Sequence, residues 1–213
     1  MGKISASLLS CDHMRLGEQA LAAEQAGVHF FHIDVMDGHY VENLAFSPQT
    51  VADLKKLCSL PISVHLETFR PEGMVPMFLR AGADIITFQL DACPNPIHLL
   101  KTIRQGGALA GIGIGPAYPV EPLTYLFHHM DWLILMSVEP GYGGQAFEYG
   151  VLEKIRTARQ LMDKHGCRVP ICVDGGVNAE TGRQLLSAGA DVLISGSYLF
   201  RGGEIPKRVA ALM

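Results

Sequence analysis

Long apolar runs, paired cysteines and clusters of basic residues are all missing from this chain of 213 residues. No run of 18 or more uncharged apolar residues occurs, so we expect no membrane-spanning helix and no membrane partner. The five cysteines contain no C-x-x-C pair and are odd in number, which favours a reduced, cytoplasmic protein. The net charge is −4 and the basic residues are dispersed, so we also expect no nucleic-acid partner.

Apolar residues are abundant, and their arrangement predicts the fold class. They make up 48% of the chain, and a chain of this length suits a single domain over residues 1–213. Three times a segment of helical periodicity ends at an Ala-Gly pair and a short apolar run follows, at Ala26-Gly27, Ala81-Gly82 and Ala188-Gly189. Glycine suits the left-handed position after a helix, and continuous apolar runs are typical of strands covered on both faces.

This alternation extends along the whole chain. The predicted strands cover residues 3–8, 29–34, 61–66, 83–89, 108–114, 131–137, 169–174 and 191–195. The predicted helices between most of them cover residues 15–26, 48–58, 72–81, 95–105, 150–164 and 179–188. Eight alternations without a linker predict an α/β fold, a single (β/α)8 TIM barrel. An open, doubly wound sheet is the alternative, but its glycine fingerprint after the first strand is missing.

Polar side chains recur where the predicted strands end, which is the edge of a barrel where catalysis takes place. His32 and Asp34 end the second strand, and side chains two residues apart in a strand point to the same face. Ser7, His65 and Asp174 end the first, third and seventh strands. Two histidines and two aspartates converging on one barrel mouth can hold a divalent cation.

Each of these residues also has a structural interpretation. A buried histidine is often satisfied by a backbone carbonyl, and Asp174 can cap the helix or turn that follows it. Convergence at one barrel mouth favours function, and Gly175 and Gly176 already supply a turn after Asp174. Asp37 has a fair interpretation as a turn residue beside Gly38. Five further histidines are expected on loops or exposed helix faces: His39, His98, His128, His129 and His165.

Glycine-rich segments follow three neighbouring strands. They are Pro140-Gly141-Tyr142-Gly143-Gly144-Gln145, Asp174-Gly175-Gly176 and Ser195-Gly196-Ser197. Glycine lets backbone N–H groups approach an anion closely, and a short helix that begins there adds a favourable dipole. Phosphate binding by the loops after strands seven and eight recurs in barrels. Together the three segments predict a phosphate site.

In order and together, these segments resemble the ribulose-phosphate 3-epimerase family over nearly the whole chain. The resemblance rests on Ser7-Leu8-Leu9-Ser10, His32-Ile33-Asp34-Val35-Met36-Asp37-Gly38-His39, Val64-His65-Leu66, Pro140-Gly141-Tyr142-Gly143-Gly144-Gln145, Val173-Asp174-Gly175-Gly176 and Gly196-Ser197. It implies a (β/α)8 barrel that binds one divalent cation and inverts C3 of a ketose phosphate. It also suggests a homo-oligomer.

The resemblance implies a role for each candidate residue. His32, Asp34, His65 and Asp174 would hold the cation, and the two aspartates would also be the paired catalytic acid and base. The residues expected around the substrate and its phosphate are Ser7, His65, Met36, Met136, Gly141, Tyr142, Gly143, Gly144, Gly175, Gly176, Gly196 and Ser197.

The chemistry of epimerisation agrees with these roles. Inverting a carbon beside a ketone requires removal of its proton from one face and return of a proton to the other. Two carboxyl groups do this when one is ionised and the other protonated. A cation stabilises the oxyanion that develops. Two histidines and two aspartates suit zinc, manganese, iron(II) or cobalt, and the residues alone do not choose among these metals.

Departures from the family pattern concern the substrate. The family usually has Met where this chain has Glu67, and it tends to have His where this chain has Gln89. Neither change removes a proposed ligand, but Glu67 brings a carboxylate to a lid that Met36 and Met136 still supply. We therefore expect a pentulose phosphate (D-ribulose 5-phosphate or D-xylulose 5-phosphate) as substrate, with a hexulose phosphate such as D-allulose 6-phosphate as the alternative. Further departures are Ser47, Gly115 and Glu139.

Two functions of other kinds also fit a phosphate-binding barrel. A Schiff-base aldolase needs a lysine inside the barrel, but the lysines fall at helical or early-strand positions, and the Asp-x-Lys-x-x-Asp pattern of related decarboxylases is absent. A non-catalytic sugar-phosphate-binding barrel would not require a paired acid and base. Incorporation of solvent deuterium at C3 of a ketose phosphate distinguishes these functions.

Overall fold

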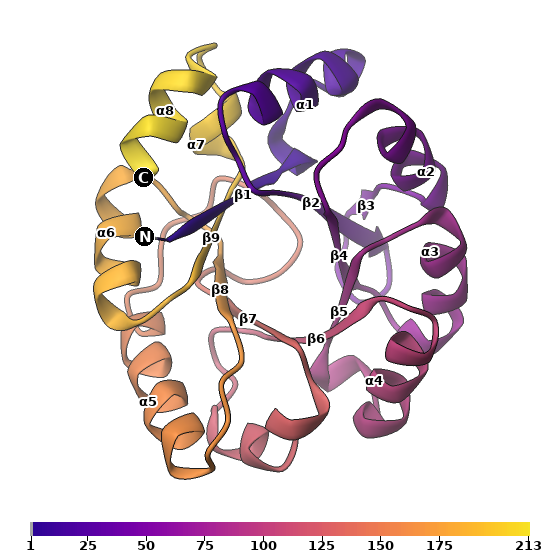
Figure 1. Cartoon of the computed structure of the whole chain (residues 1–213), viewed down its shortest axis with the longest axis vertical. Helices are drawn as coiled ribbons and strands as arrows, with labels where there is room; N and C mark the ends of the chain where they lie inside the picture. Colours follow the sequence, from indigo (N-terminus) through magenta and orange to yellow (C-terminus); the bar gives the residue numbers. More distant parts are fainter. Residues whose placement is uncertain (1) are drawn as a thin grey trace.

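Eight parallel strands form a closed ring in the computed structural model, which describes residues 2–213 (Figure 1). In ring order the strands are β1 (Lys3–Ser7), β2 (Phe30–Asp37), β4 (Ile62–Glu67), β5 (Ile85–Gln89), β6 (Leu109–Ile114), β7 (Trp132–Met136), β8 (Ile171–Asp174) and β9 (Val192–Ser195). The ring closes because β1 pairs in parallel with both β2 and β9. The predicted single (β/α)8 barrel is confirmed, and the open doubly wound sheet is wrong.

Helices surround the ring on all sides (Figure 1). They are α1 (Leu16–Gln25), α2 (Pro48–Leu57), α3 (Val75–Ala81), α4 (Pro96–Gln105), α5 (Val151–Lys164), α6 (Ala179–Ala188), α7 (Ser197–Phe200) and α8 (Ile205–Leu212). Helix α3 ends at Gly82 and α6 at Gly189, both left-handed with φ of 92° and 113°, as the Ala-Gly pattern predicts. No helix within residues 2–213 is long and apolar enough to cross a membrane.

The structure differs from the predicted elements in two places. Strand β2 continues past residue 34 to Asp37, because Met36 and Asp37 pair with a short antiparallel strand, β3 (Leu44–Ala45). Between β6 and β7, where no helix was predicted, the chain forms two 3₁₀ turns, Glu121–Tyr125 and Phe127–His129. Three prolines occur between residues 116 and 122, and proline disrupts a helix interior. Helices α7 and α8 were not predicted.

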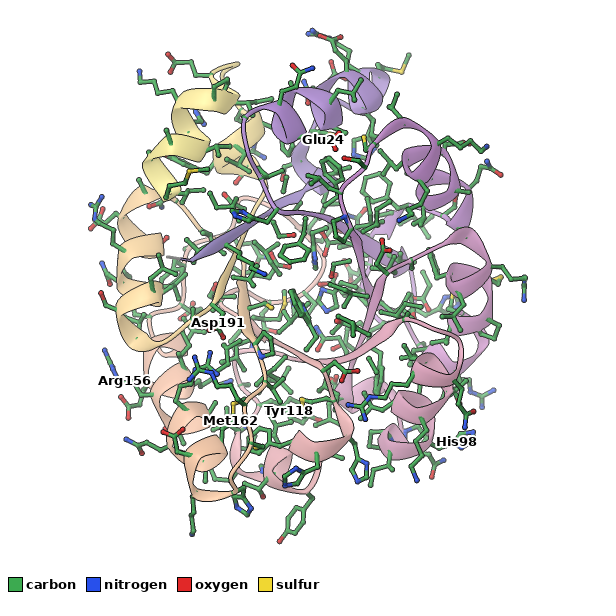
Figure 2. The ribbon with its side chains drawn as sticks, viewed as in Figure 1. Glu24, His98, Tyr118, Arg156, Met162 and Asp191 are labelled. Carbon is green, nitrogen blue, oxygen red and sulfur yellow. The ribbon has the colours of Figure 1, made fainter. Side chains whose placement is uncertain are left out.

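Side chains alternate along each strand between the helical layer and the interior of the barrel. On β2, Ile33 and Val35 join the main apolar core against the helices, whereas His32 and Asp34 lie on the other face. Side chains fill the space inside the ring, so it is a packed core and not a pore (Figure 2). A separate apolar cluster includes Ile85, Trp132, Ile134, Met136, Val138, Cys172, Val192 and Ile194, with Phe30 packed against it. The buried polar side chains therefore concentrate on β1, β2, β4 and β5.

Candidate active site

Four side chains from three strands meet at the carboxyl-terminal mouth of the barrel. One ligand atom from each of His32, Asp34, His65 and Asp174 lies within 4.8 Å of all the others. Asp34 Oδ1 is 3.0 Å from His32 Nε2 and 3.5 Å from His65 Nδ1. Asp174 Oδ2 is 3.4 Å from His32 Nε2 and 3.9 Å from His65 Nδ1. The four residues singled out in the sequence are thus brought together.

Strand register places Asp34 and His65 at one level. His32 is in register with Ser7 on β1, and Asp34 with His65 on β4. One step further toward the mouth, Met36 is in register with Glu67. Because neighbouring parallel strands carry their side chains on the same face at paired positions, Asp34 and His65 lie side by side.

The four-residue cluster is rich in buried polar atoms that have no hydrogen-bond partner. His32 and His65 are fully buried, and the side chain of Asp34 is 4% exposed. Both ring nitrogens of His32, Asp34 Oδ1 and His65 Nδ1 have no partner among the described residues. Such atoms are rare in proteins because each is costly to bury. His32 Nε2, Asp34 Oδ1 and His65 Nδ1 lie within 4.8 Å of one another, an arrangement that suits a divalent cation.

The charges of the cluster shift its protonation equilibria. Burial lowers the pKa of His32, but the Asp34 and Asp174 carboxylates outweigh it and raise that pKa to about 10. Burial raises the pKa of Asp34, and the His32 and His65 imidazoles outweigh it and hold that pKa well below its usual range. A cation in the cluster would take the place of the His32 proton, since a metal ligand must be deprotonated.

Neighbouring groups fix both aspartates. Ser7 Oγ donates to Asp34 Oδ2 at 2.9 Å, which leaves Oδ1 turned toward the two histidines. Ser137, which follows β7, donates its backbone N–H and its hydroxyl to the carbonyl of Asp174, at 2.8 and 2.9 Å. Asn178 caps α6 by accepting from the N–H groups of residues 180 and 181. The capping role considered for Asp174 therefore falls to Asn178.

Gln89 contacts the far side of the His65 ring. Its Nε2 lies 3.2 Å from His65 Nε2, and its Oε1 is buried without a partner within residues 2–213. Rotation of the amide by 180° would turn Oε1 toward a proton on His65 Nε2, which leaves Nδ1 with a lone pair facing the cluster. Gly113 makes room for this pair, since a Cβ there would lie 2.9 Å from His65 Nε2.

Glycine loops line the rest of the mouth. Gly175 and Gly176 follow β8 with φ of 107° and 58°, and Gly141 and Gly144 in the loop after β7 have φ of 121° and 83°, all in the left-handed region that favours glycine. A Cβ at Gly175 would lie 2.5 Å from a methyl group of Val138. The cavity at the mouth is lined by Ser7, Leu9, Ser10, Asp34, Met36, Glu67, Met136, Val138, Glu139, Gly141, Tyr142, Gly143, Gly144, Asp174, Gly175, Gly176, Val177, Ile194, Gly196 and Ser197.

Seven lining residues were not among the predicted site residues: Leu9, Ser10, Glu67, Val138, Glu139, Val177 and Ile194. Ser10 packs closely against two of the glycine loops. A Cβ at Gly143 would lie 2.6 Å from Ser10 Oγ, and a Cβ at Gly196 would lie 3.2 Å from it. Its signal was present in the first family segment, Ser7 to Ser10. Glu67 is also one of the seven, and its side chain is 2% exposed. Burial, together with the Asp34 and Asp174 carboxylates, raises the pKa of Glu67 well above its usual range.

Other candidates lie outside the cluster. Asp37 accepts bonds from the N–H groups of His39, Tyr40 and Phe69, so it organises a turn, as its structural interpretation had it. Of the five histidines expected on the surface, His39, His98, His128 and His165 are exposed and His129 is half-buried. His98 and Arg156 lie on the outside of the helical layer (Figure 2). No lysine among residues 2–213 lines the cavity.

Known proteins similar to this chain agree with the geometry. The model of the ribulose-phosphate 3 epimerase family matches residues 3–200. A ribulose-phosphate 3-epimerase of Bacillus subtilis is 37% identical over 100% of this chain and 98% of its own length. One of Mycobacterium leprae is 39% identical, covering 98% of this chain and 92% of its own, and one of Escherichia coli is 40% identical, covering 92% and 88%.

Solved structures of lower sequence identity show the same fold. A variant of the tryptophan synthase α-subunit from Pyrococcus furiosus has a TM-score of 0.74 at 17% identity and covers 100% of this chain and 99% of its own. Identity this low shows the fold alone. The family match and the relatives above 30% identity carry the assignment. The chain belongs to the ribulose-phosphate 3-epimerase family, which confirms the predicted family and the predicted class of isomerase acting on carbohydrate phosphates.

Proposed function

We propose that this chain is a metal-dependent 3-epimerase of a ketose phosphate, with D-ribulose 5-phosphate and D-xylulose 5-phosphate as its substrate pair. The observation that carries the proposal is the cluster of His32, Asp34, His65 and Asp174, whose ligand atoms lie within 4.8 Å of one another beside a glycine-lined cavity. The relatives named as ribulose-phosphate 3-epimerases support the pentulose substrate.

The residues present fit a single divalent cation. His32 Nε2, His65 Nδ1 and one oxygen from each aspartate would be its ligands, and three of these four atoms have no hydrogen-bond partner among the described residues. When bound, a cation of this kind acts as a Lewis acid on the substrate oxygens and stabilises their developing charge. Zinc, manganese, iron(II) and cobalt all suit two imidazoles and two carboxylates.

The two aspartates carry the proton transfers. Asp34 on β2 and Asp174 on β8 stand three strands apart around the ring, so they approach a bound substrate from different directions. The ionised carboxylate takes the C3 proton from one face of the substrate, and the protonated one delivers a proton to the other face of the enediolate. Ser7 holds Asp34 in place for this role through its 2.9 Å hydrogen bond.

We expect backbone groups to hold the phosphate, since no lysine or arginine within residues 2–213 lines the cavity. Gly175, Gly176 and Gly196 line the cavity at the ends of β8 and β9, and α7 begins at Ser197. Backbone N–H groups that point into a glycine-lined hollow bind an anion without a fixed positive charge. Met36 and Met136 cover the reacting carbon from the two sides of the mouth and exclude water.

Exchange of the C3 proton tests the function directly. Metal-stripped and metal-restored protein is incubated in D2O with pentulose, hexulose and tetrulose phosphates, and deuterium at C3 is followed by NMR. We expect exchange only with metal, and fastest with the pentulose phosphate. Fastest exchange with D-allulose 6-phosphate, which the unusual Glu67 and Gln89 favour, would move the substrate to the hexulose class. Phosphate binding without any C3 exchange would support a non-catalytic sugar-phosphate-binding barrel.

The state of the cysteines bears on where in the cell the protein is found. All five cysteines are free, and four of them are buried. Free thiols support the predicted cytoplasmic location, where the glutathione and thioredoxin systems keep cysteines reduced. The predicted homo-oligomer stays a prediction that sedimentation of the purified protein measures.

A further inference from the structure

Glu67 is a buried carboxylate that the proposed mechanism does not use. It ends β4 at the barrel mouth, its side chain is 2% exposed, and it lines the cavity. Its Oε2 has no hydrogen-bond partner within the part of the chain described. A buried carboxylate oxygen without a partner is costly, so its retention at a cavity wall calls for a partner supplied by a ligand.

The position of Glu67 in the ring identifies the part of the ligand that it faces. Strand β4 lies four strands from β8 in either direction around the closed ring, so the two strands are diametrically opposed. The glycines proposed to hold the phosphate, Gly175, Gly176 and Gly196, follow β8 and β9. Glu67 stands across the mouth from the phosphate site, with the Asp34 and Asp174 carboxylates between.

The order of atoms in the substrate then indicates which of its groups lies near Glu67. A ketose phosphate carries its phosphate at one end, its reacting C3 in the middle and a hydroxymethyl group, C1, at the other end. With the phosphate at β8 and C3 between the two aspartates, C1 extends toward β4. We infer that Glu67 determines specificity by accepting a hydrogen bond from the C1 hydroxyl of the substrate, an assignment that rests on the proposed function.

Two other roles for this carboxylate fit the geometry less well. Glu67 is not one of the four residues whose ligand atoms lie within 4.8 Å of one another, and its Oε1 is 3.9 Å from His65 Nδ1. The backbone N–H of Gly141 lies near the carboxyl group and lowers its pKa, against the larger effect of burial. That contact still leaves Oε2 without a partner. Neither a ligand role nor a tether to the Gly141 loop accounts for the free oxygen.

The assignment does not depend on the length of the sugar. In a pentulose 5-phosphate and in a hexulose 6-phosphate alike, C1 is the end opposite the phosphate. Glu67 would therefore favour any ketose phosphate with a free C1 hydroxyl over its 1-deoxy analogue. A site built to bond a hydroxyl rejects the analogue that lacks it, because the buried polar group is then left unpaired.

The test compares D-xylulose 5-phosphate with 1-deoxy-D-xylulose 5-phosphate. The rate of deuterium incorporation at C3 is measured for the wild type, Glu67→Met and Glu67→Gln, each loaded with the same metal. We expect the wild type to prefer the 1-hydroxy substrate, and Glu67→Met to reduce that preference by about 10- to 100-fold. Glu67→Gln keeps one acceptor oxygen and nearly the same shape, so it should retain part of the preference.

Thr68→Val is the matched control, because Thr68 is the adjacent residue, is equally buried and does not line the cavity. This variant should keep the wild-type preference. Equal losses on both substrates in the Glu67 variants, with or without loss of bound metal, would overturn the inference while leaving the epimerase function standing. Absence of C3 exchange by the wild type with D-xylulose 5-phosphate would instead overturn the proposed function itself.

Discussion

The two ends of the barrel contain aspartates that differ in how many partners they have. At the amino-terminal end, Asp84, Asp131 and Asp191 each precede a strand. Each accepts a bond from a backbone N–H near the start of a neighbouring strand, at 2.7, 3.0 and 2.8 Å. Each also pairs with a basic side chain of an outer helix, namely Lys55, Arg104 and Arg159. Asp191 lies at the inner edge of the helical layer formed by α5 and α6 (Figure 2).

The aspartates at the mouth lack such partners. Asp34 has one bond, from Ser7, and its other oxygen faces two histidines without forming a hydrogen bond. Asp174 contacts the same histidines at 3.4 and 3.9 Å. The same residue type thus joins strand to helix at one end and has few partners at the other. Strand position and partner count together, and not residue type, separate the aspartates that join elements from those proposed to act in catalysis.

Asp174→Asn gives the largest expected effect. Asparagine keeps the shape of the side chain but cannot carry the proton, so the C3 exchange rate should fall by about 10²–10⁴-fold, the usual contribution of a positioned acid or base. Folding should not suffer, because the change removes one of several negative groups crowded at the mouth. Deuterium exchange measures the rate, and urea unfolding of the metal-free protein measures the stability.

Asp191→Asn is the matched control at the other end. It removes an ion pair with Arg159 and weakens the bond to the start of β8, so it should lower stability and leave the C3 exchange rate of the folded protein within a few-fold of wild type. If both variants lost activity to a similar degree, the contrast between the two ends would be wrong.

Removal of a proposed metal ligand should give the second largest effect. His32→Ala takes an imidazole from the centre of the cluster, and zinc affinity by calorimetry should fall by more than the roughly 10- to 100-fold that loss of an outer partner costs. Because a tightly bound ion stabilises the folded state by about 4 kcal/mol at 1,000 times its dissociation constant, zinc should raise the Tm of the wild type and not that of the variant. An equal rise in both would exclude the cluster as the site.

Local signals explain why so much of the fold was predictable. Apolar runs, the Ala-Gly pairs and the glycine loops are each contained in a few residues, and they gave the ring and the strand ends. Strand β3 depends on pairing with β2 and was missed. Helix α8 was missed because it follows Gly202 and Gly203, and two adjacent glycines are typical of a loop.

The site was predictable as a set of residues but not as a set of contacts. His65 faces Asp34 because the two are in register across β2 and β4, and register is not readable from either strand alone. The bond from Ser7 to Asp34 and the contact of Gln89 with His65 arise in the same way. The residue types at the mouth can therefore be predicted from the sequence. The number of hydrogen-bond and ion-pair partners of each aspartate is fixed only when the barrel closes.

Gln89→Leu tests whether the mouth depends on such an outer contact. Loss of the amide frees the proton on His65 to move to Nδ1, where it blocks a ligand position, so zinc affinity should fall by about 10- to 100-fold. Calorimetry at fixed pH measures the change. Thr87→Val is the control, since Thr87 precedes Gln89 on the same face of β5, is equally buried and does not line the cavity. A similar loss in both variants would assign the effect to packing.

Asp131→Asn gives the smallest effect and carries a pH dependence. Against the opposing effect of burial, the Arg104 guanidinium and the Ala110 N–H lower the pKa of Asp131 below its usual range. A carboxyl group whose pKa is lower in the folded state stabilises the protein above its unfolded pKa, about 3.9, and loses this contribution as the pH falls through its folded pKa.

Since the Asp131 side chain is 27% exposed, we expect its loss to cost about 1–2 kcal/mol of unfolding free energy at pH 7. Urea unfolding of the wild type and the variant at pH 7 and pH 3 measures the difference, which should shrink at the lower pH. A difference that stays constant would mean that Asp131 acts through packing and not through its charge. The charge of Asp131 would then contribute nothing to stability, and ion pairing would not distinguish the aspartates at the amino-terminal end from those at the mouth.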